Sequence, residues 1–354
     1  MRDMSRFSKA KIIDCHAHLW MLRDRINDES LRMQGEALNE VIGGAPLNQI
    51  YIFGRKGHSA LYLKAKYPGK FYAGGYVPWT GDASGFKVDW PSYINSLIDF
   101  GYDGVGEMGS KPVYREKHAP LDSAYYEGLW ESCEAMKYSV LCHVGDVEDF
   151  WHPESTPDWA KVRGWGYWRG DYPTMGELWA EIENVLTAHP RLKIVLCHLL
   201  FMSPHMERLE DFLHNHRNAH VDLTPGIELL YNISRRREDW RRFFIEHDDR
   251  ILFGTDIGMS NTYPQHLARV WLLRKFLESD EEYYTPKETD DALTRYEEPF
   301  IGLSLPRASY EKIYTGNFRK LWGEKPRSIK IDAAIAASEE LGDHSVAKAL
   351  RSLN

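Results

Sequence analysis

The stretch KIVLCHLL, residues 193–200, places His198 directly after a short run of apolar, mostly branched residues. A short apolar run of this kind is typical of a strand that is buried on both faces, as strands are in a parallel sheet. The same pattern recurs in SVLCHVG at 139–145 and in RILFGTDIG at 250–258, which carry a histidine and an aspartate after the run. The recurrence predicts several parallel strands, each with a polar residue at its C-terminal end.

Outward from these runs, β-rich segments alternate with amphipathic helical segments along most of the chain. Strands are expected at residues 11–16, 49–53, 71–77, 104–107, 139–143, 193–198, 219–223 and 250–256. Helices are expected at residues 90–100, 125–136, 175–188, 204–214, 236–246 and 264–277. Eight strands that alternate with helices predict an α/β fold, and at 354 residues a closed (β/α)8 TIM barrel accommodates them economically.

The barrel is expected to form one domain over residues 1–323. Beyond it, residues 324–354 include IDAAIAASEELGDHSVAKALRSL, which predicts two short helices after the last barrel helix. We expect this C-terminal helical extension to pack on the barrel and to take no part in chemistry.

The overall composition excludes several classes of protein. With 44 Lys+Arg against 52 Asp+Glu the net charge is −8, which argues against a basic nucleic-acid binder. The longest strongly apolar stretch, residues 194–202, is too short to cross a bilayer. We therefore expect a cytoplasmic protein that acts on a small molecule and binds neither nucleic acid nor a membrane. The composition leaves a homo-oligomer open.

Two histidines end the first expected strand, in KIIDCHAH at 11–18. His16 and His18 are two residues apart, so a regular strand would turn both imidazoles to the inside of the barrel mouth. The same alternation would turn Cys15 and Cys197, which precede histidines, toward the surrounding helices.

All C-terminal strand ends of a parallel barrel open on one face, so the polar residues that follow the strands are expected to lie close together. Several imidazoles with a carboxylate suit zinc or a related divalent metal in a site that keeps one position open for catalysis. Any one of these histidines could instead be a hydrogen-bonded core residue. The set consists of His16, His18, His143, His198 and Asp256.

The ordered set, with HxH on strand one, histidines ending strands five and six, and Asp ending strand eight, resembles the amidohydrolase superfamily. It is similar in particular to the amidohydrolase-2 branch, which contains metal-dependent decarboxylases of the aminocarboxymuconate semialdehyde type. The segment YEKIYTGNFRKLWG at 310–323 resembles the helix near the end of the barrel in this branch. The resemblance spans residues 11–323.

This resemblance implies a divalent metal cofactor, for which zinc is the first choice, with one ion or two. His198 would contact the metal-bound water or help to hold a second ion, and would share the catalytic role with Asp256. The implied metal ligands are His16, His18, His143 and Asp256.

Strand four departs from the pattern of the superfamily, whose common carbamylated lysine is absent. Instead GYDGVGEMG at 101–109 places Glu107 there, which is similar to the glutamate of TatD-like metal-dependent hydrolases. Glu107 is therefore either a metal ligand, to one ion or bridging two, or a structural acid that supports the ligands, with Lys111 as a candidate charge partner.

Candidate substrate-binding residues lie in two loops. Residues 144–176 hold four of the 12 tryptophans, and form either a loop packed by its own rings or an aromatic wall at the barrel mouth. Trp151, Trp165 and Trp168 are the candidates there. Arg55, after strand two, is a candidate for binding a substrate carboxylate.

The predicted function is a metal-dependent hydrolase in which a metal-activated water attacks an ester, lactone or amide carbonyl. The substrate would be small, carboxylated and cyclic or aromatic. Asp256 would accept the proton of the water, and His198 would supply the proton of the leaving group. The same side chains also suit a non-oxidative decarboxylase, a lyase, acting on an aromatic or muconate-like acid. A catalytically silent barrel that binds ligands is a third alternative, and a TatD-type nuclease, disfavoured by the acidic balance, is a fourth.

Overall fold

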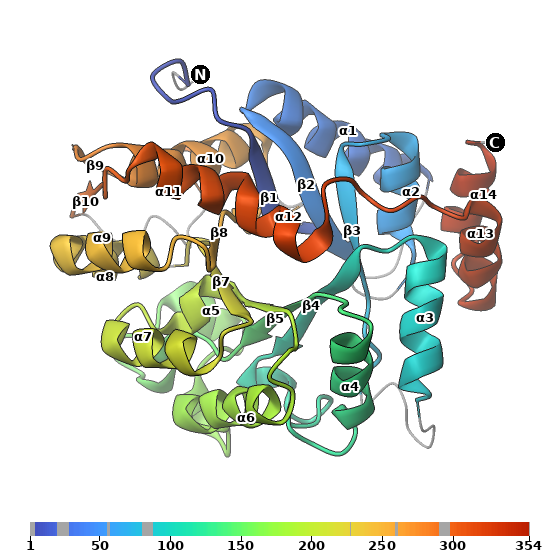
Figure 1. Ribbon diagram of the computed structural model, residues 1–354, viewed down its shortest axis with the longest axis horizontal. Coiled ribbons are helices and arrows are strands. Elements are labelled where there is room, and N and C mark those ends of the chain that lie inside the picture. Colours follow the sequence, from blue (N-terminus) through green and yellow to red (C-terminus); the bar gives the residue numbers. More distant parts are fainter. Residues whose placement is uncertain are drawn as a thin grey trace.

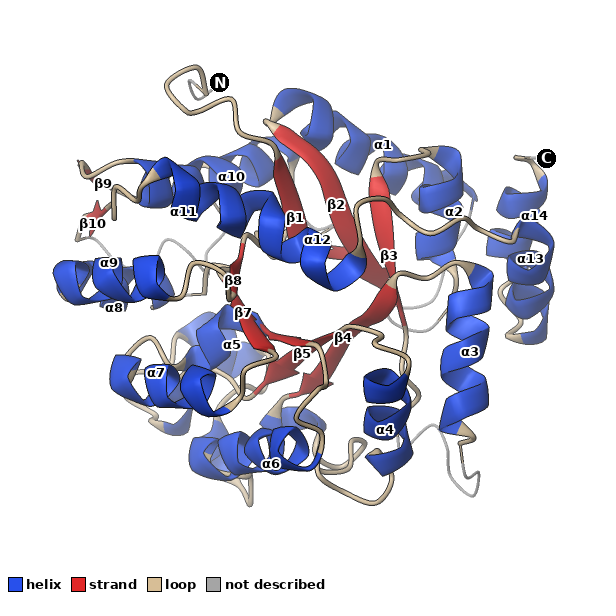
Figure 2. Cartoon of the chain, viewed as in Figure 1, coloured by secondary structure: helices blue, strands red, loops and turns tan. Residues whose placement is uncertain are grey.

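The computed structural model describes residues 4–19, 28–54, 57–79, 88–226, 228–258, 261–289 and 298–353. Eight parallel strands follow one another in chain order around a barrel, with helices on the outside (Figure 2). A separate antiparallel pair, β9 and β10, lies outside the barrel. The strands are β1 (Ile12–Leu19), β2 (Leu47–Gly54), β3 (Phe71–Gly75), β4 (Gly104–Ser110), β5 (Val140–Val144), β6 (Ile194–Leu196), β7 (Ala219–Asp222), β8 (Ile251–Leu252), β9 (Glu282–Tyr283) and β10 (Phe300–Ile301).

The barrel closes because the chain after β8 returns to β1. The Cys15 amide donates to the Phe253 carbonyl at 2.9 Å, and the His18 amide donates to the Ile257 carbonyl at 2.8 Å. The Asp256 amide donates in the opposite direction, to the His16 carbonyl at 3.0 Å. These bonds bring the C-terminal ends of the first and last strands together.

Helices fill the crossovers, and all six of those expected from the sequence are present with shifts of a few residues at their ends. The α-helices are α1 (Asp28–Gly44), α2 (Ser59–Lys66), α3 (Trp90–Phe100), α4 (Glu127–Ala135), α5 (Asp158–Val162), α6 (Met175–Ala188), α7 (Met206–Asn215), α8 (Leu229–Arg235), α9 (Arg237–Glu246), α10 (Tyr263–Glu278), α11 (Arg307–Glu311), α12 (Asn317–Trp322), α13 (Ile331–Glu340) and α14 (His344–Arg351). The described residues also form the 3₁₀ segments η1 (Pro112–Tyr114), η2 (Glu148–Trp151), η3 (Tyr167–Arg169) and η4 (Cys197–Phe201), and the π-helical segment η5 (Lys312–Gly316).

Local signals fix the helix bounds that were predicted best. The Asp89 carboxylate caps α3 by accepting from the Ser92 amide at 3.2 Å, and Gly101 ends the helix with a φ of 99°, which glycine adopts without a steric cost. Thr174 and Glu177 form a reciprocal capping box at the start of α6.

The N-terminal end of the barrel is closed by α12, which crosses it in Figure 1. Phe318, Leu321 and Trp322 of this helix pack into one apolar cluster with inward-facing strand residues such as Tyr51 and Leu141. The polar residues that follow the strands lie at the opposite end, because the eight strands are parallel and their C-terminal ends share one face.

At the C-terminal ends of two strands, the side chains depart from the expected alternation between the barrel interior and the helices. β1 carries a bulge, since Asp14 pairs with Ile50 whereas Ala17 pairs with Ile52. One extra residue on β1 lets Cys15 face the barrel interior as well as His16, so the expectation that Cys15 faces the helices is wrong.

The second difference lies after β6, which ends at Leu196 and not at His198 as expected. His198 through Phe201 adopt positive φ values, so the chain leaves the strand in a left-handed path. Cys197, which precedes this turn, faces the interior with Val195 by strand alternation, and this contradicts its expected direction.

The two helices expected after residue 324 are present as α13 and α14, which lie beside α2 and α3 (Figure 1). The Arg327 amide donates to the Asp103 carboxylate at 2.7 Å, which joins this extension to the barrel. Within the described residues, the helices are all too short or too polar to pass through a bilayer.

Candidate functional site

The bulge in β1 presents both histidines of the HxH pair to the barrel mouth. The His16 and His18 Nε2 atoms face one another at 3.2 Å. His16 is fully buried, whereas the side chain of His18 is 13% exposed. The predicted convergence of the pair is therefore present, although it needs the bulge as well as strand alternation.

Asp256 joins this pair from the other side of the barrel seam. Its Oδ1 lies 2.9 Å from His18 Nε2 and 3.5 Å from His16 Nε2. Asp256 has a φ of 54°, and this left-handed turn redirects the chain after β8. The cap of α10 is Thr262, so Asp256 is not held there as a helix cap.

Glu107 on β4 lies between two groups of imidazoles. Its Oε1 is 2.9 Å from His143 Nδ1 and 3.7 Å from His16 Nε2, and its Oε2 is 3.7 Å from His18 Nε2. The candidate charge partner Lys111 instead contacts Asp146. The described contacts of Glu107 are thus with histidines.

The contacts of His198 fix which ring nitrogen carries hydrogen. The Thr224 hydroxyl donates to Asp222 at 2.5 Å, so toward His198 Nδ1, 2.9 Å away, this oxygen acts as an acceptor. The Thr224 carbonyl, 3.1 Å from the same nitrogen, can only accept. His198 Nδ1 therefore donates, and in the neutral ring Nε2 carries a lone pair.

Asp222 on β7 is a fully buried carboxylate that sequence reasoning missed. It accepts from His16 Nδ1 at 2.9 Å and from the His198 amide at 2.8 Å, in addition to the hydroxyl of Thr224. One side chain thus orients two of the histidines. One signal was present, since Asp222 lies near the C-terminal end of the strand expected at 219–223.

A second missed carboxylate, Asp14, holds the chain that leads into Asp256. It accepts from the Thr255 amide at 3.0 Å and from the Thr255 hydroxyl, and it also accepts from the His16 amide at 3.1 Å. Burial raises the pKa of Asp14 to about 6, although these hydrogen bonds lower it. Asp14 therefore links both sides of the seam at the site.

The charges at the mouth shift several pKa values in the metal-free protein. Burial lowers the pKa of His16, but the carboxylates of Asp222, Asp256 and Glu107 together raise it to about 9. Burial and the neighbouring His143 lower the pKa of His198 to about 4. Burial raises the pKa values of Glu107 and Asp256, but the surrounding imidazoles hold both well below their usual range.

The donor atoms fit a divalent cation. His143 Nε2 lies 3.1 Å from the Gly145 carbonyl, which can only accept, while its Nδ1 faces the Glu107 carboxylate. Both ring nitrogens thus face acceptors, but a neutral imidazole carries hydrogen on only one of them. The other contact therefore requires a second proton or a metal cation. Two groups have their ligand atoms within 4.8 Å of one another and share Glu107: His16, His18 and Glu107, and Glu107, His143 and His198.

The aromatic segment at 144–176 packs mainly on itself. The Trp151 ring lies 4.7 Å from that of Tyr167, and its indole nitrogen donates to the Pro173 carbonyl at 3.1 Å. Trp165 packs on Trp159 and also contacts Lys111, which follows β4. Trp168 lies against Arg169.

These contacts match the alternative of a loop packed by its own rings. They leave the substrate-binding roles of Trp151, Trp165 and Trp168 as predictions. Arg55, the fourth candidate, lies outside the described residues.

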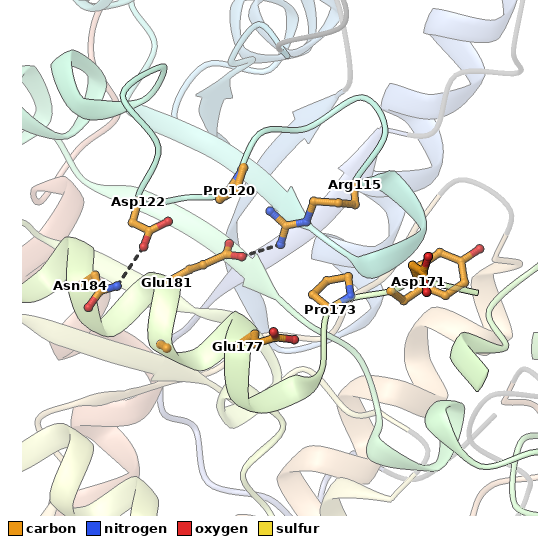
Figure 3. A pocket seen from close by; sticks show the side chains of 10 residues that line it. Arg115, Pro120, Asp122, Asp171, Pro173, Glu177, Glu181 and Asn184 are labelled. Carbon is orange, nitrogen blue, oxygen red and sulfur yellow. Dashed lines mark hydrogen bonds and ion pairs between the residues drawn. The ribbon is translucent and has the colours of Figure 1, made fainter. Parts of the chain in front are cut away.

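A hollow of about 610 Å³ lies on the surface between the loop after η1 and the start of α6 (Figure 3). Arg115 points across it to Glu181, with which it forms an ion pair at 2.7 Å. Its other lining residues include Asp122 and Glu177, and none of its lining residues belongs to the histidine cluster. We assign it no role in the chemistry.

Known structures share the fold of this chain at low sequence identity. An uncharacterized TIM-barrel protein from Bordetella bronchiseptica is 18% identical, with a TM-score of 0.51 over 88% of this chain and 98% of that one. IDCase from Metarhizium anisopliae in apo form is 13% identical, with a TM-score of 0.51 over 88% and 97%. Dihydroorotase from Campylobacter jejuni is 14% identical, with a TM-score of 0.50 over 88% and 83%. These similarities confirm the predicted TIM barrel.

No curated protein matches the sequence. A family model described as amidohydrolase, that of the amidohydrolase-2 family, matches residues 96–323, which is more than half of the chain. The match includes β4 to β8 and therefore Glu107, His143, His198 and Asp256, while the HxH pair lies before it. The chain accordingly belongs to the amidohydrolase-2 family, as the order of its strand-end residues predicted.

Proposed function

We propose that the chain is a metal-dependent hydrolase that cleaves an ester, lactone or amide bond in a small carboxylated, cyclic or aromatic substrate. Membership in the amidohydrolase family supports a hydrolase-type enzyme. The observation that carries the proposal is the convergence of four imidazoles and two carboxylates at the barrel mouth, in two groups that share Glu107.

The proposed metal ligands follow from which ring nitrogens of the histidines are already used in hydrogen bonds. His16 Nδ1 donates to Asp222, and His198 Nδ1 donates to Thr224. In the neutral rings both Nε2 atoms therefore carry a lone pair that can bind a metal ion. His18 and Asp256 complete the first group, and His143 the second. When bound, a divalent ion such as zinc would lower the pKa of water to about 7 and polarise a carbonyl oxygen.

Asp256 is the proposed proton carrier. Its side chain is 29% exposed, whereas the carboxylate of Asp222 is fully buried, so Asp256 can reach a water molecule and a substrate. Because its pKa lies well below the usual range, it is ionised at neutral pH and can accept the proton of the attacking water. The bond between the carbonyl carbon and the leaving group then breaks, and Asp256 returns the proton to that group.

The contacts of His198 revise one step expected from the sequence. A neutral His198 has its hydrogen on Nδ1, directed at Thr224, and therefore has none on Nε2 to give to a leaving group. The pKa of about 4 keeps the ring neutral at physiological pH. We therefore assign the return of the proton to Asp256 and a ligand role to His198.

The test is turnover of a panel of lactones, esters, amides and aromatic carboxylic acids by zinc-loaded protein, with chelator-treated protein as the control. Zinc-dependent hydrolysis is the expected result. Release of carbon dioxide from a carboxylic acid would instead identify the decarboxylase alternative. Stoichiometric zinc without turnover of any compound would favour the silent barrel.

A further inference from the structure

A second polar cluster lies just beyond the strand ends, next to the histidines. Lys111 follows β4 directly, and Asp146 follows β5 by two residues. The Tyr167 hydroxyl donates to Asp146 Oδ2 at 2.8 Å, and the Lys111 ammonium lies 4.1 Å from the centre of the Trp165 ring. This cluster connects the barrel mouth to the aromatic segment at 144–176.

The ammonium of Lys111 has hydrogen-bonding capacity left over. Its contacts with the two carboxylate oxygens of Asp146 are long, at 3.3 and 3.5 Å, while Asp146 has its short contact with Tyr167. An ammonium has three donors, and this one lies on a side chain that is only 16% exposed. Burial lowers the pKa of Lys111, but the nearby Asp146, Tyr114 and Glu107 raise it by more than burial lowers it. The pKa therefore lies above its usual value, and the ammonium is charged.

Gly109 lies on β4 between Glu107 and Lys111, and as a glycine it has no side chain there. Glu107, Gly109 and Lys111 alternate with outward-facing residues such as Met108, and Lys111 keeps an extended backbone with a φ of −76° and a ψ of 144°. Gly109 pairs with His143, and a methyl group built on it would meet no atom within 4 Å. The position of Gly109, between Glu107 and Lys111 on the chain, therefore has open space in front of it.

We propose that Lys111 is the specificity-determining residue that binds a carboxylate of the substrate while the reacting carbonyl lies at the histidine cluster. This inference rests on the proposed function and adds the anionic group that the substrate must carry. Lysine suits the task as a compact charge, and partial burial strengthens its attraction to an anion. Trp165, through its ring face, and Asp146 hold the ammonium in place and are positioning residues.

The test compares two probes on zinc-loaded protein by titration calorimetry: terephthalate and benzoate, neither of which contains an ester, lactone or amide bond that the proposed enzyme would cleave. Both present one carboxylate to the metal, and only terephthalate has a second for Lys111. We expect wild-type protein to bind terephthalate roughly 10- to 100-fold more tightly, the range for a hydrogen bond to a charged group. Lys111→Met should reduce this ratio to about one, while Lys117→Met, at an exposed lysine nearby, should leave it unchanged.

Zinc content and circular dichroism of each variant separate the outcomes. If Lys111→Met does not fold, Lys111→Gln serves in its place, because an amide can still contact Asp146 without the charge. A preference for terephthalate that survives in the folded variant, or that wild-type protein lacks, would overturn the inference while leaving the proposed function intact. Failure of wild-type protein to retain zinc would count against the proposed function itself.

Discussion

The histidine cluster and the aromatic segment at 144–176 lie next to one another but are held in opposite ways. In the cluster, buried ring nitrogens are fixed by carboxylates from distant strands, as His16 is by Asp222. In the segment, rings pack on neighbouring rings of the same loop, as Trp151 does on Tyr167. The side chains of the histidine cluster are therefore oriented by residues of other strands, whereas the rings of the aromatic segment are oriented mainly by one another.

The largest effect on metal binding and activity is expected from replacing His18 in the histidine cluster. His18→Ala removes one of the two facing Nε2 donors, so bound metal and activity should both fall below detection while the barrel stays folded. Metal analysis and circular dichroism measure the two effects. The matched control is His152→Ala, at an exposed histidine of the aromatic segment. Stoichiometric metal in the His18 variant would remove this residue from the ligand set.

The next effect concerns the carboxylate of Asp256. Asp256→Asn preserves size but removes the proton acceptor, so turnover should fall about 100-fold or more, the scale of losing positioned acid–base catalysis. Steady-state kinetics on any substrate found in the panel measures this loss. Asp89→Asn, at the cap of α3, should leave turnover unchanged because Asn caps a helix about as well. Full activity of the Asp256 variant would defeat the proposed mechanism.

The pH dependence of metal binding should follow from the pKa of His16, about 9 in the metal-free protein. Below that pH His16 is protonated and must lose its proton before Nε2 can bind a cation. Metal affinity should therefore rise with pH up to about 9, by about tenfold per unit for one released proton. Competition with a chelator at several pH values measures it, and an affinity independent of pH would contradict the assignment.

Glu107→Gln distinguishes a site that binds one metal ion from a site that binds two. Glu107 is common to both groups of donors, so removing its charge should lower metal content by one ion or weaken affinity about tenfold or more. Titration of metal-free protein with zinc gives both quantities. Unchanged stoichiometry together with unchanged affinity would show that Glu107 only supports the fold.

The smallest effect is expected in the aromatic segment. Trp151→Phe removes the indole donor to the Pro173 carbonyl but keeps a ring against Tyr167, so it should cost about 1 kcal/mol of stability. Metal content should not change. Thermal unfolding and metal analysis test both statements, and loss of metal would show that the segment orients the cluster after all.

The sequence predicted most of the fold because buried strands and amphipathic helices leave distinct periodicities. It also predicted His16, His18 and Asp256 as neighbours, since parallel strands end on one face. It did not predict the bulge that turns Cys15 inward, because a single inserted residue depends on pairing with β2. Nor did it predict the hydrogen position on His198, which depends on Thr224, 26 residues away in sequence. Such details arise from contacts between strands and have no local signature.

A metal site at the histidine cluster is tested most directly by a crystal structure of zinc-soaked protein with anomalous diffraction recorded at the zinc absorption edge. We expect an anomalous peak within bonding distance of His16 and His18 Nε2 and of Asp256. A second peak beside His143 and His198, with Glu107 between the two, would establish a two-ion site. The absence of any peak at the histidine cluster in a fully soaked crystal, with the side chains placed as described, would show that these residues do not form a metal site.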